Sequence, residues 1–325
     1  MVSMKKYLLV GGNGVIGHFV ARRLVREGHR PVIMSRGGDT TLIGDIQDQC
    51  DNVRADMTDR KAVDDVLRNN GITHIVHLGA ALPSITEIDP AAATRQNIEG
   101  TVNVLEAAKN HGVQRVVMAS TKAVYGQVSG QYGAPSYVPV PETVSNPVTV
   151  YGITKWTCEL LGRWYRQTHG IGFIALRFGA TIGPGKIARH GGSYSRYSVV
   201  IENAMAGEPV RIESGADEVC DILYNDEAAR GVICALHAPH PQHDVYNIAT
   251  GTGFTMRQYA AAVKCVFPDA DISFGTKPST GAVNFVLDGT RARDDLGFVA
   301  DPDVNQIVKD YVATMRSLKL VPDVA

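Results

Sequence analysis

The 325-residue sequence is poor in cysteine, has almost no net charge and contains no long hydrophobic run. Its five cysteines are scattered without a Cys-x-x-Cys pair or a histidine at zinc-ligand spacing, so we expect neither a disulfide framework nor a metal site. The formal net charge of −1, with acids and bases interspersed, favours neither nucleic acid nor an anionic membrane as a partner. The first apolar run is too short for a signal peptide or a membrane span. We therefore expect a reduced, cytoplasmic protein with a small-molecule partner.

The sequence is instead rich in glycine, and the first glycine cluster has a clear pattern. An apolar run at 7–10 leads into Gly-Gly-Asn-Gly-Val-Ile-Gly, and helical periodicity follows. Gly11 permits a tight turn, Gly14 lets the backbone approach a pyrophosphate, and Gly17 lets the helix lie close to the strand. The N–H groups at the helix start then bind phosphate. Such turns also occur as plain loops, but the position between strand and helix predicts a dinucleotide site formed by Gly11, Asn13, Gly14, Val15, Ile16 and Gly17.

The same strand and helix patterns alternate along the first half of the chain. Apolar runs near 31–34, 75–78 and 113–119 are separated by helical patterns. This alternation predicts an α/β protein with a Rossmann-type, doubly wound parallel sheet, whose ligand lies at the carboxyl ends of the strands. We expect residues 1–180, with about 218–238, to form the dinucleotide-binding domain. Residues 181–217 and 239–325 would form a smaller C-terminal substrate-binding lobe.

The residues after the second strand predict which dinucleotide binds. NAD-preferring sites usually place an acid here, to accept a hydrogen bond from the ribose 2′-hydroxyl group. This sequence has Ser35 and Arg36, a hydroxyl and a planar cation that suit a 2′-phosphate. We therefore expect NADP as the cofactor. If Arg36 instead stacks over the adenine or faces solvent, NAD remains possible.

Two later strands add expected cofactor contacts. Asp56 could accept a hydrogen bond from the adenine amino group, although capping of the next helix is an alternative. The fourth strand ends in small residues that let a cofactor pass close to the backbone. We interpret His77 as a packing residue and not as a catalytic one. The contacts expected from these strands are Asp56, Met57, Leu78, Gly79 and Ala80.

The main catalytic candidate is the pair formed by Tyr151 and Lys155. At a spacing of four residues on a helix, the phenol and the ammonium lie on one face. A free phenol has a pKa of roughly 10, and a nearby ammonium lowers it, so Tyr151 becomes a usable acid or base. A surface Tyr-Lys pair is the alternative. Ser120 and Thr121 end a preceding strand, and the loop at 126–147 has the length of a functional lid or an insertion.

Together these motifs resemble an extended short-chain dehydrogenase/reductase, the NAD-dependent epimerase/dehydratase group. The resemblance covers nearly the whole chain and implies that Tyr151 is the acid or base. It also implies that Lys155 holds the nicotinamide ribose and lowers the phenol pKa, and that Thr121 binds the reacting oxygen. The matching residues are Gly11, Gly14, Gly17, Asp56, Asn97 in Asn-x-x-Gly-Thr, Ser120-Thr121-x-x-Val-Tyr-Gly126, Tyr151-x-x-x-Lys155, Leu176-Arg177 and Gly183-Pro184-Gly185.

Further contacts are implied by the same resemblance. The additional cofactor contacts are Asn97, Phe178, Ala180 and Thr181, although Asn97 could simply brace the sheet. Pro83 and Ser84 are implied as substrate contacts, together with Thr121. Related members dimerise through the Tyr-x-x-x-Lys helix and the helix before it, here about 151–169 and 92–111. The apolar residues Trp156, Leu160, Leu161 and Trp164 fit a homodimer, or they complete the core.

Departures from the family pattern bear on the substrate. Epimerases of nucleotide sugars typically have Asn where this chain has Ala180, and Arg where it has Cys220. The family's 4,6-dehydratases have an Asp-Glu pair where Lys122 and Ala123 stand. We therefore expect a substrate that is neither a nucleotide sugar nor a target of that elimination. Lys122 could meet an anionic substrate group or remain solvated.

The polar, glycine-containing stretch at 186–197 has the composition of a binding segment over the site, or of an ordinary surface loop. Its candidate substrate contacts are His190, Ser193 and Arg196.

The sequence thus predicts an NAD(P)-dependent oxidoreductase that moves a hydride between the nicotinamide and a secondary alcohol or ketone, with Tyr151 as acid or base. The first alternative is an NAD-dependent sugar epimerase with tightly bound cofactor. The second is a non-catalytic NADP-sensing protein on the same fold.

Overall fold

The computed structural model describes residues 5–190, 195–277 and 284–320. Its centre is a seven-stranded sheet in the order β11-β6-β5-β4-β1-β2-β3, in which all neighbouring strands are parallel. The order runs outward from β1 in both directions, so the expected Rossmann-type sheet is confirmed. The strands are β1 (Tyr7–Val10), β2 (Val32–Ser35), β3 (Asp51–Arg54), β4 (His74–His77), β5 (Arg115–Thr121), β6 (Gly172–Phe178) and β11 (Val245–Ile248).

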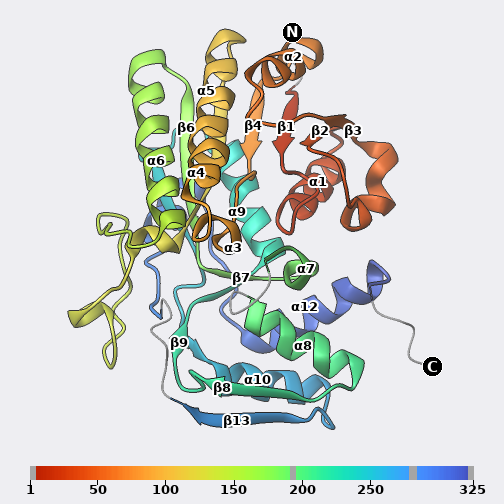
Figure 1. Cartoon of the computed structure of the whole chain (residues 1–325), viewed down its shortest axis with the longest axis vertical. Helices are drawn as coiled ribbons and strands as arrows, with labels where there is room; N and C mark the ends of the chain where they lie inside the picture. The colour runs from red at the N-terminus through yellow and green to blue at the C-terminus, as the bar shows by residue number, and fades with distance from the viewer. Residues whose placement is uncertain (1–4, 191–194, 278–283, 321–325) are drawn as a thin grey trace.

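Helices cover both faces of this sheet (Figure 1). Because side chains alternate along a strand, Leu9 of β1 packs with α1 and α9, whereas Leu8 packs with α2, α5 and α6. Burial on both faces is consistent with the full burial of β1 and β4, and β1 is accordingly apolar. The covering helices are α1 (Gly17–Arg26), α2 (Arg60–Asn70), α5 (Gly100–Asn110), α6 (Val150–His169) and α9 (Asn225–His237).

Short helices connect these elements. They are η1 (Thr41–Gln49), α3 (Pro83–Thr86), α4 (Pro90–Ala93), η2 (Thr94–Glu99), η3 (Lys122–Tyr125), η4 (Gly130–Tyr132), α7 (Lys186–His190) and α11 (Thr290–Leu296). The segment η2 is a π-helical turn that joins α4 to α5.

A smaller lobe lies beyond the carboxyl ends of the strands (Figure 1). It contains the parallel pair β8 (Val210–Ser214) and β13 (Ile272–Lys277), and the antiparallel pair β9 (Val219–Cys220) and β12 (Phe254–Thr255). Its helices are α8 (Arg196–Ala206), α10 (Met256–Val266) and α12 (Val304–Ser317), and the pair β7 (Ala180–Ile182) and β10 (Ile222–Tyr224) leads toward it. One hydrophobic cluster runs from the sheet into this lobe, and the domain boundary near residue 180 stays a prediction.

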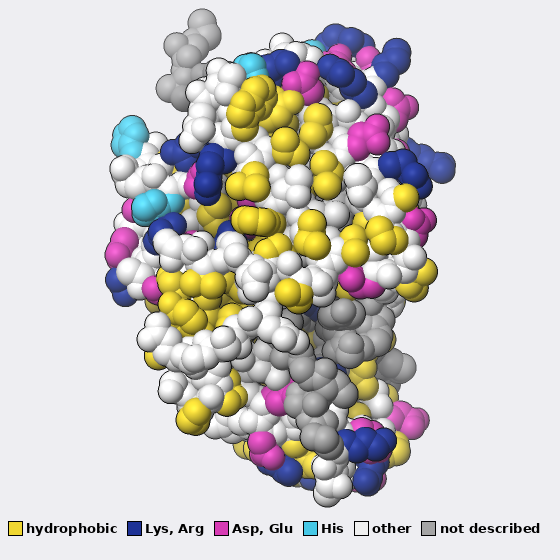
Figure 2. Space-filling model, turned by 60° about the vertical axis from the view of Figure 1, so that its left-hand side comes forward, with side chains coloured by type: hydrophobic (Ala, Val, Ile, Leu, Met, Phe, Trp, Pro, Cys, Tyr) yellow, Lys and Arg dark blue, Asp and Glu magenta, His cyan; other side chains and the backbone are white. Residues whose placement is uncertain are grey.

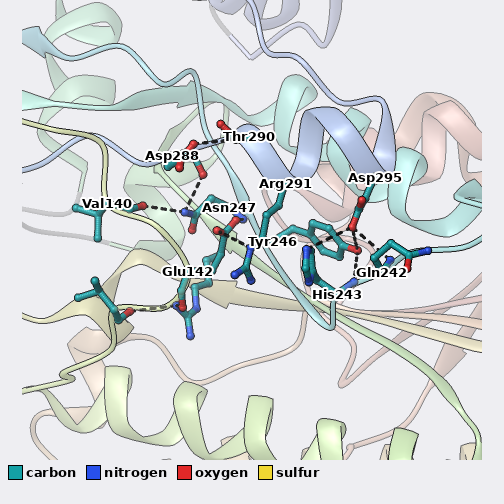
Figure 3. Close-up of polar contacts among 12 residues, drawn as sticks. Val140, Glu142, Gln242, His243, Tyr246, Asn247, Asp288, Thr290, Arg291 and Asp295 are labelled. Carbon is teal, nitrogen blue, oxygen red and sulfur yellow. Dashed lines mark hydrogen bonds and ion pairs between the residues drawn. The ribbon is translucent and has the colours of Figure 1, made fainter.

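The loop at 126–147, expected as a lid or insertion, is fastened to the sheet and to the segment before α11 (Figure 3). Val140 pairs with Leu287 as an isolated bridge. The buried Asn247 of β11 donates to the Val140 and Asp288 carbonyls, at 3.1 and 3.0 Å, and accepts from the Tyr125 hydroxyl at 2.5 Å. These buried hydrogen bonds hold this part of the loop in one position against β11 and the segment before α11.

Candidate active site

A cavity of about 1180 Å³ lies between the carboxyl ends of the strands and the smaller lobe. This is the position where open parallel sheets bind ligands. The residues expected from sequence that line it are Gly11, Asn13, Gly14, Val15, Ile16, Gly17, Ser35, Arg36, Asp56, Met57, Leu78, Gly79, Ala80, Pro83, Ser84, Thr121, Lys122, Tyr151, Lys155, Phe178, Ala180, Thr181 and Arg196.

The glycine-rich turn forms one wall of the cavity. Gly11 has φ +80°, a left-handed conformation that favours glycine. A Cβ on Gly17 would lie 2.5 Å from the Gly11 carbonyl oxygen, so only glycine lets α1 start this close to the turn. The resulting cradle of backbone at a helix start suits the pyrophosphate of a dinucleotide.

The neighbouring wall fits the adenosine end of such a ligand. Ser35 ends β2, and the exposed Arg36 follows it at the cavity edge. Asp56 accepts from the backbone N–H and the hydroxyl of Thr58, both at 2.9 Å, and it also lines the cavity. The α2 cap is Asp59, which accepts from the Ala62 N–H, so the capping alternative for Asp56 is wrong.

Asn97 and His77 lie behind the cavity wall. Asn97 is 1% exposed, and its amide bonds the Ala81 backbone at 2.7 and 3.2 Å and the Thr154 hydroxyl at 3.0 Å. These contacts brace α6 against the end of β4, and Asn97 is not among the residues that line the cavity. The buried His77 ring bonds the Thr101 hydroxyl at 3.0 Å, and burial lowers its pKa to about 3. A neutral packing role for His77 follows.

The helix α6 positions Tyr151 and Lys155. Thr149 caps its start by accepting from the Gly152 N–H at 3.1 Å, and the helix ends at Gly170 with φ +70°. The Tyr151 side chain reaches the cavity, which Thr121, the last residue of β5, also lines. Lys155 lies one turn further along α6 and is 2% exposed. The arrangement brings an acid, a hydroxyl and a cation to one point.

The pKa values at this point differ from the expectation. Burial raises the pKa of Tyr151 to about 12, although the hydrogen bond with Thr121 lowers it. Burial also lowers the pKa of Lys155. Desolvation is the largest influence on the phenol, and the expected effect of the Lys155 ammonium is not among the influences on it. Tyr151 is a protonated phenol at neutral pH, the form that can donate a proton.

A buried polar network fixes the helix that carries Tyr151 and Lys155. Arg177 of β6 forms an ion pair with Glu159 of α6, with a shortest distance of 2.7 Å. Glu159 also accepts a hydrogen bond from Ser120, the neighbour of Thr121 in β5. Both partners of the ion pair are almost fully buried, so the network fixes α6 against the two strands.

The far end of the cavity combines Lys186, which the sequence analysis did not select, with Lys122 and Arg196, which it did. Lys186 at the start of α7 is 7% exposed, and its ammonium donates to the Thr181 carbonyl and hydroxyl at 2.5 and 2.7 Å. Lys122 donates to the Cys220 sulfur at 3.3 Å. Arg196 pairs with Glu218 at 3.4 Å. The polar stretch at 186–197 was the only sequence signal for Lys186.

Two further expected substrate contacts fall at or beyond the limit of the described residues. His190 ends α7, and nothing is described of its side chain. Ser193 lies outside the described residues. Within residues 5–190, 195–277 and 284–320, no cluster of His, Cys, Asp or Glu is arranged to hold a metal ion. No helix in these same ranges is long and apolar enough to cross a membrane.

The Rossmann-type sheet, the glycine cradle and the Thr-Tyr-Lys group define the class of dinucleotide-dependent enzymes. The model of the NAD dependent epimerase/dehydratase family matches residues 7–249, and the chain belongs to this family.

Curated relatives in this family include dehydrogenases and epimerases. The mitochondrial L-threonine 3-dehydrogenase of Bos taurus is 26% identical, over 94% of this chain and 81% of the relative. The UDP-glucose 4-epimerase of Streptomyces lividans is also 26% identical, over 90% of this chain and 91% of the relative. The chain is accordingly an enzyme of the dehydrogenase or epimerase kind.

Solved structures agree with this placement. The L-threonine dehydrogenase from Cupriavidus necator, in its holo form, has a TM-score of 0.82 and 28% identity, with 95% of this chain and 99% of that chain covered. The UDP-glucose 4-epimerase of Thermotoga maritima, solved with UDP-glucose, has a TM-score of 0.86 and 24% identity, with 97% and 100% covered. At that identity, the second likeness supports the fold alone.

Proposed function

We propose that the enzyme is an NAD(P)-dependent dehydrogenase or reductase that acts on a secondary alcohol or its ketone. The observation that carries this proposal is that Tyr151, Thr121 and the buried Lys155 line the same cavity as the glycine cradle. A bound nicotinamide would supply or accept the hydride, and the residues of this chain would move the proton.

In the reductive direction, Tyr151 donates its proton to the carbonyl oxygen as that oxygen gains charge. Thr121 orients the same oxygen by a hydrogen bond, and the Lys155 ammonium stabilises the phenolate that remains. The raised pKa of Tyr151 favours this direction at neutral pH, because the phenol begins in its acid form. In oxidation the phenolate takes the hydroxyl proton, and this requires the bound state to lower the phenol pKa.

The cofactor proposed is NADP, with NAD as the alternative. Arg36 at the cavity edge supports NADP, since a guanidinium pairs well with a 2′-phosphate. The UDP-glucose 4-epimerase of Thermus thermophilus, of similar structure, was solved in complex with NAD. We infer that the substrate is not a nucleotide sugar, because Cys220 and Ala180 offer no cation or amide to a sugar diphosphate.

An epimerase is the second candidate, and the similarity to UDP-glucose 4-epimerases favours it. An epimerase returns the hydride to the same substrate and keeps its cofactor. Extraction of cofactor from denatured, freshly purified protein separates the two functions. Empty protein supports the dehydrogenase, whereas stoichiometric retained NAD supports the epimerase.

The variant Tyr151→Phe tests the catalytic assignment. We expect turnover of a ketone panel to fall by about 10²- to 10⁴-fold, because a positioned general acid contributes that much. Dissociation constants for NAD and NADP should change less than twofold, since only one hydroxyl is lost. Tyr165→Phe is the matched control, because Tyr165 lies on the same helix and its hydroxyl bonds Glu106. Turnover retained in Tyr151→Phe at the level of Tyr165→Phe contradicts the assignment.

A further inference from the structure

The Glu87 side chain is bonded to the start of the helix that carries Tyr151. Glu87 directly follows α3, and α3 packs against α6 (Figure 1). The Glu87 Oε1 atom accepts a hydrogen bond from the Tyr151 backbone N–H at 3.0 Å, and the Oε2 atom accepts one from the Val150 N–H at 3.2 Å. A residue 64 positions earlier in the chain thus holds the main chain of Tyr151.

Side chains accept from all the N–H groups in the first turn of α6. The first N–H groups of an α-helix have no acceptor within the helix, and here they belong to Val150, Tyr151 and Gly152. Glu87 accepts from the first two, and the Thr149 hydroxyl accepts from the Gly152 N–H at 3.1 Å. Because a carboxylate also interacts favourably with the positive end of a helix, Glu87 keeps the turn that carries Tyr151 from fraying.

The short helix before Glu87 connects this contact to the cavity. Pro83 and Ser84, at the start of α3, line the cavity. Thr86, at the end of α3, is fully buried, and its hydroxyl donates to the Glu87 Oε1 atom at 3.1 Å. This bond restricts the rotation of the carboxylate that binds α6. The segment therefore joins the expected substrate side of the cavity to the first turn of α6.

We infer that Glu87 is a positioning residue for Tyr151, because its carboxylate holds the first turn of α6 and with it the origin of the phenol side chain. For the reaction itself this role rests on the function proposed above. Glu87 is not among the residues that line the cavity, so it acts through the main chain of Tyr151 and not by touching substrate or cofactor. A displacement of about 1 Å at a reacting group costs up to about 10²-fold in rate. Loss of this contact therefore lowers turnover and spares cofactor binding.

The first test compares Glu87 variants on the ketone of the panel that the wild type reduces fastest. We expect kcat of Glu87→Ala to fall by about 10- to 10²-fold, and the dissociation constants of NAD and NADP to change by less than about twofold. Glu87→Gln keeps one acceptor oxygen, so its kcat should lie between those of Glu87→Ala and the wild type. This partial rescue shows that the acceptor, and not the size of the side chain, sets the rate.

Asp303→Ala is the matched control, since it also removes an exposed carboxylate from a helix start. Asp303 accepts from the Asn305 N–H at 2.8 Å at the start of α12, and it is not among the residues that line the cavity. The two alanine variants should lower the melting temperature to a similar extent. Only Glu87→Ala should lower kcat, because only Glu87 holds the turn that carries Tyr151.

A second measurement needs no substrate. Carbon-13 NMR of protein labelled at the tyrosine Cζ atoms reports on each phenol, and the Tyr151 signal is the one that disappears in Tyr151→Phe. We expect this signal to shift or broaden in Glu87→Ala and to stay in place in Asp303→Ala.

The outcomes separate the role of Glu87 from the proposed function. A Tyr151 signal that does not move in Glu87→Ala overturns the positioning role, and so does a kcat equal to that of the wild type or of Asp303→Ala. If the signal moves only in Glu87→Ala but the wild type reduces no ketone, the proposed dehydrogenase falls while the positioning of Tyr151 stands.

Discussion

Tyr151 and Lys155 show how a residue pattern and its surroundings can act in opposite directions. Their spacing on α6 predicts that the ammonium lowers the phenol pKa, but burial raises this pKa to about 12. Lys186 is a second case, because burial and the Lys122 charge lower its pKa to about 7. Both shifts arise from desolvation, which no local sequence pattern encodes.

The position of Arg36 leads to a prediction about cofactor preference. If its guanidinium pairs with a 2′-phosphate, Arg36→Leu should weaken NADP binding by about tenfold or more and change NAD binding less than twofold. Fluorescence titration with both cofactors measures this. Arg30→Leu is the control, because Arg30 pairs with Asp51 at 2.7 Å on the outer surface. Equal losses for NAD and NADP would show that Arg36 stacks on the adenine.

At the scale of elements, sequence patterns predicted the structural features that depend on residues close together in the chain. The strand-turn-helix unit at Gly11 to Gly17 and the spacing in α6 are of this kind, and the parallel sheet was predicted from the alternation of strands and helices. The candidate catalytic group could be predicted because Thr121 ends a strand and Tyr151 begins a helix.

The features that the sequence did not predict depend on contacts between distant segments of the chain. Lys122 and Cys220 are 98 residues apart and meet only through the lobe. The π-helical turn η2, which points Asn97 inward, has no sequence signal that we recognised. Lys186 looked like part of a polar surface stretch, and only the packing of α7 buries it. Burial of polar groups is a tertiary property, so these features could not be predicted from local patterns.

Substitution of Asn247 tests whether its hydrogen bonds hold the loop at 126–147 against the sheet. Asn247→Ala leaves the Tyr125 hydroxyl and the Val140 and Asp288 carbonyls without their buried partner. We expect a loss of roughly 3 kcal/mol in the free energy of unfolding, measured by denaturant titration. Asn52→Ala on the exposed side of β3 should cost less than about 0.5 kcal/mol. Similar losses for both variants would mean that the loop contributes little.

At the scale of the whole molecule, Figure 2 shows hydrophobic side chains gathered on one face. Exposed apolar residues of α6 and the neighbouring α3 segment are Ile85, Ile88, Ile153, Leu160 and Trp164. Trp156, also expected on this face, packs instead against the cluster around Val140. An apolar area of this kind on a helix surface supports the predicted homodimer.

The dimer prediction is tested by light scattering. We expect a mass of two chains for the wild type and of one chain for Trp164→Glu, because Trp164 is 51% exposed and a buried charge there would be unpaired. Val299→Glu is the control, since Val299 is 61% exposed on another part of the surface. A wild-type mass of one chain at every concentration contradicts the dimer.

The most direct test of the central claim is the stoichiometry between cofactor oxidised and alcohol formed. Purified enzyme is mixed with excess NADPH, or NADH, and a panel of ketones, and both products are quantified. We predict one oxidised cofactor in solution for each alcohol formed, with turnover lost in Tyr151→Phe. Turnover of a substrate with no net oxidation of added cofactor would contradict the dehydrogenase and identify an epimerase cycle.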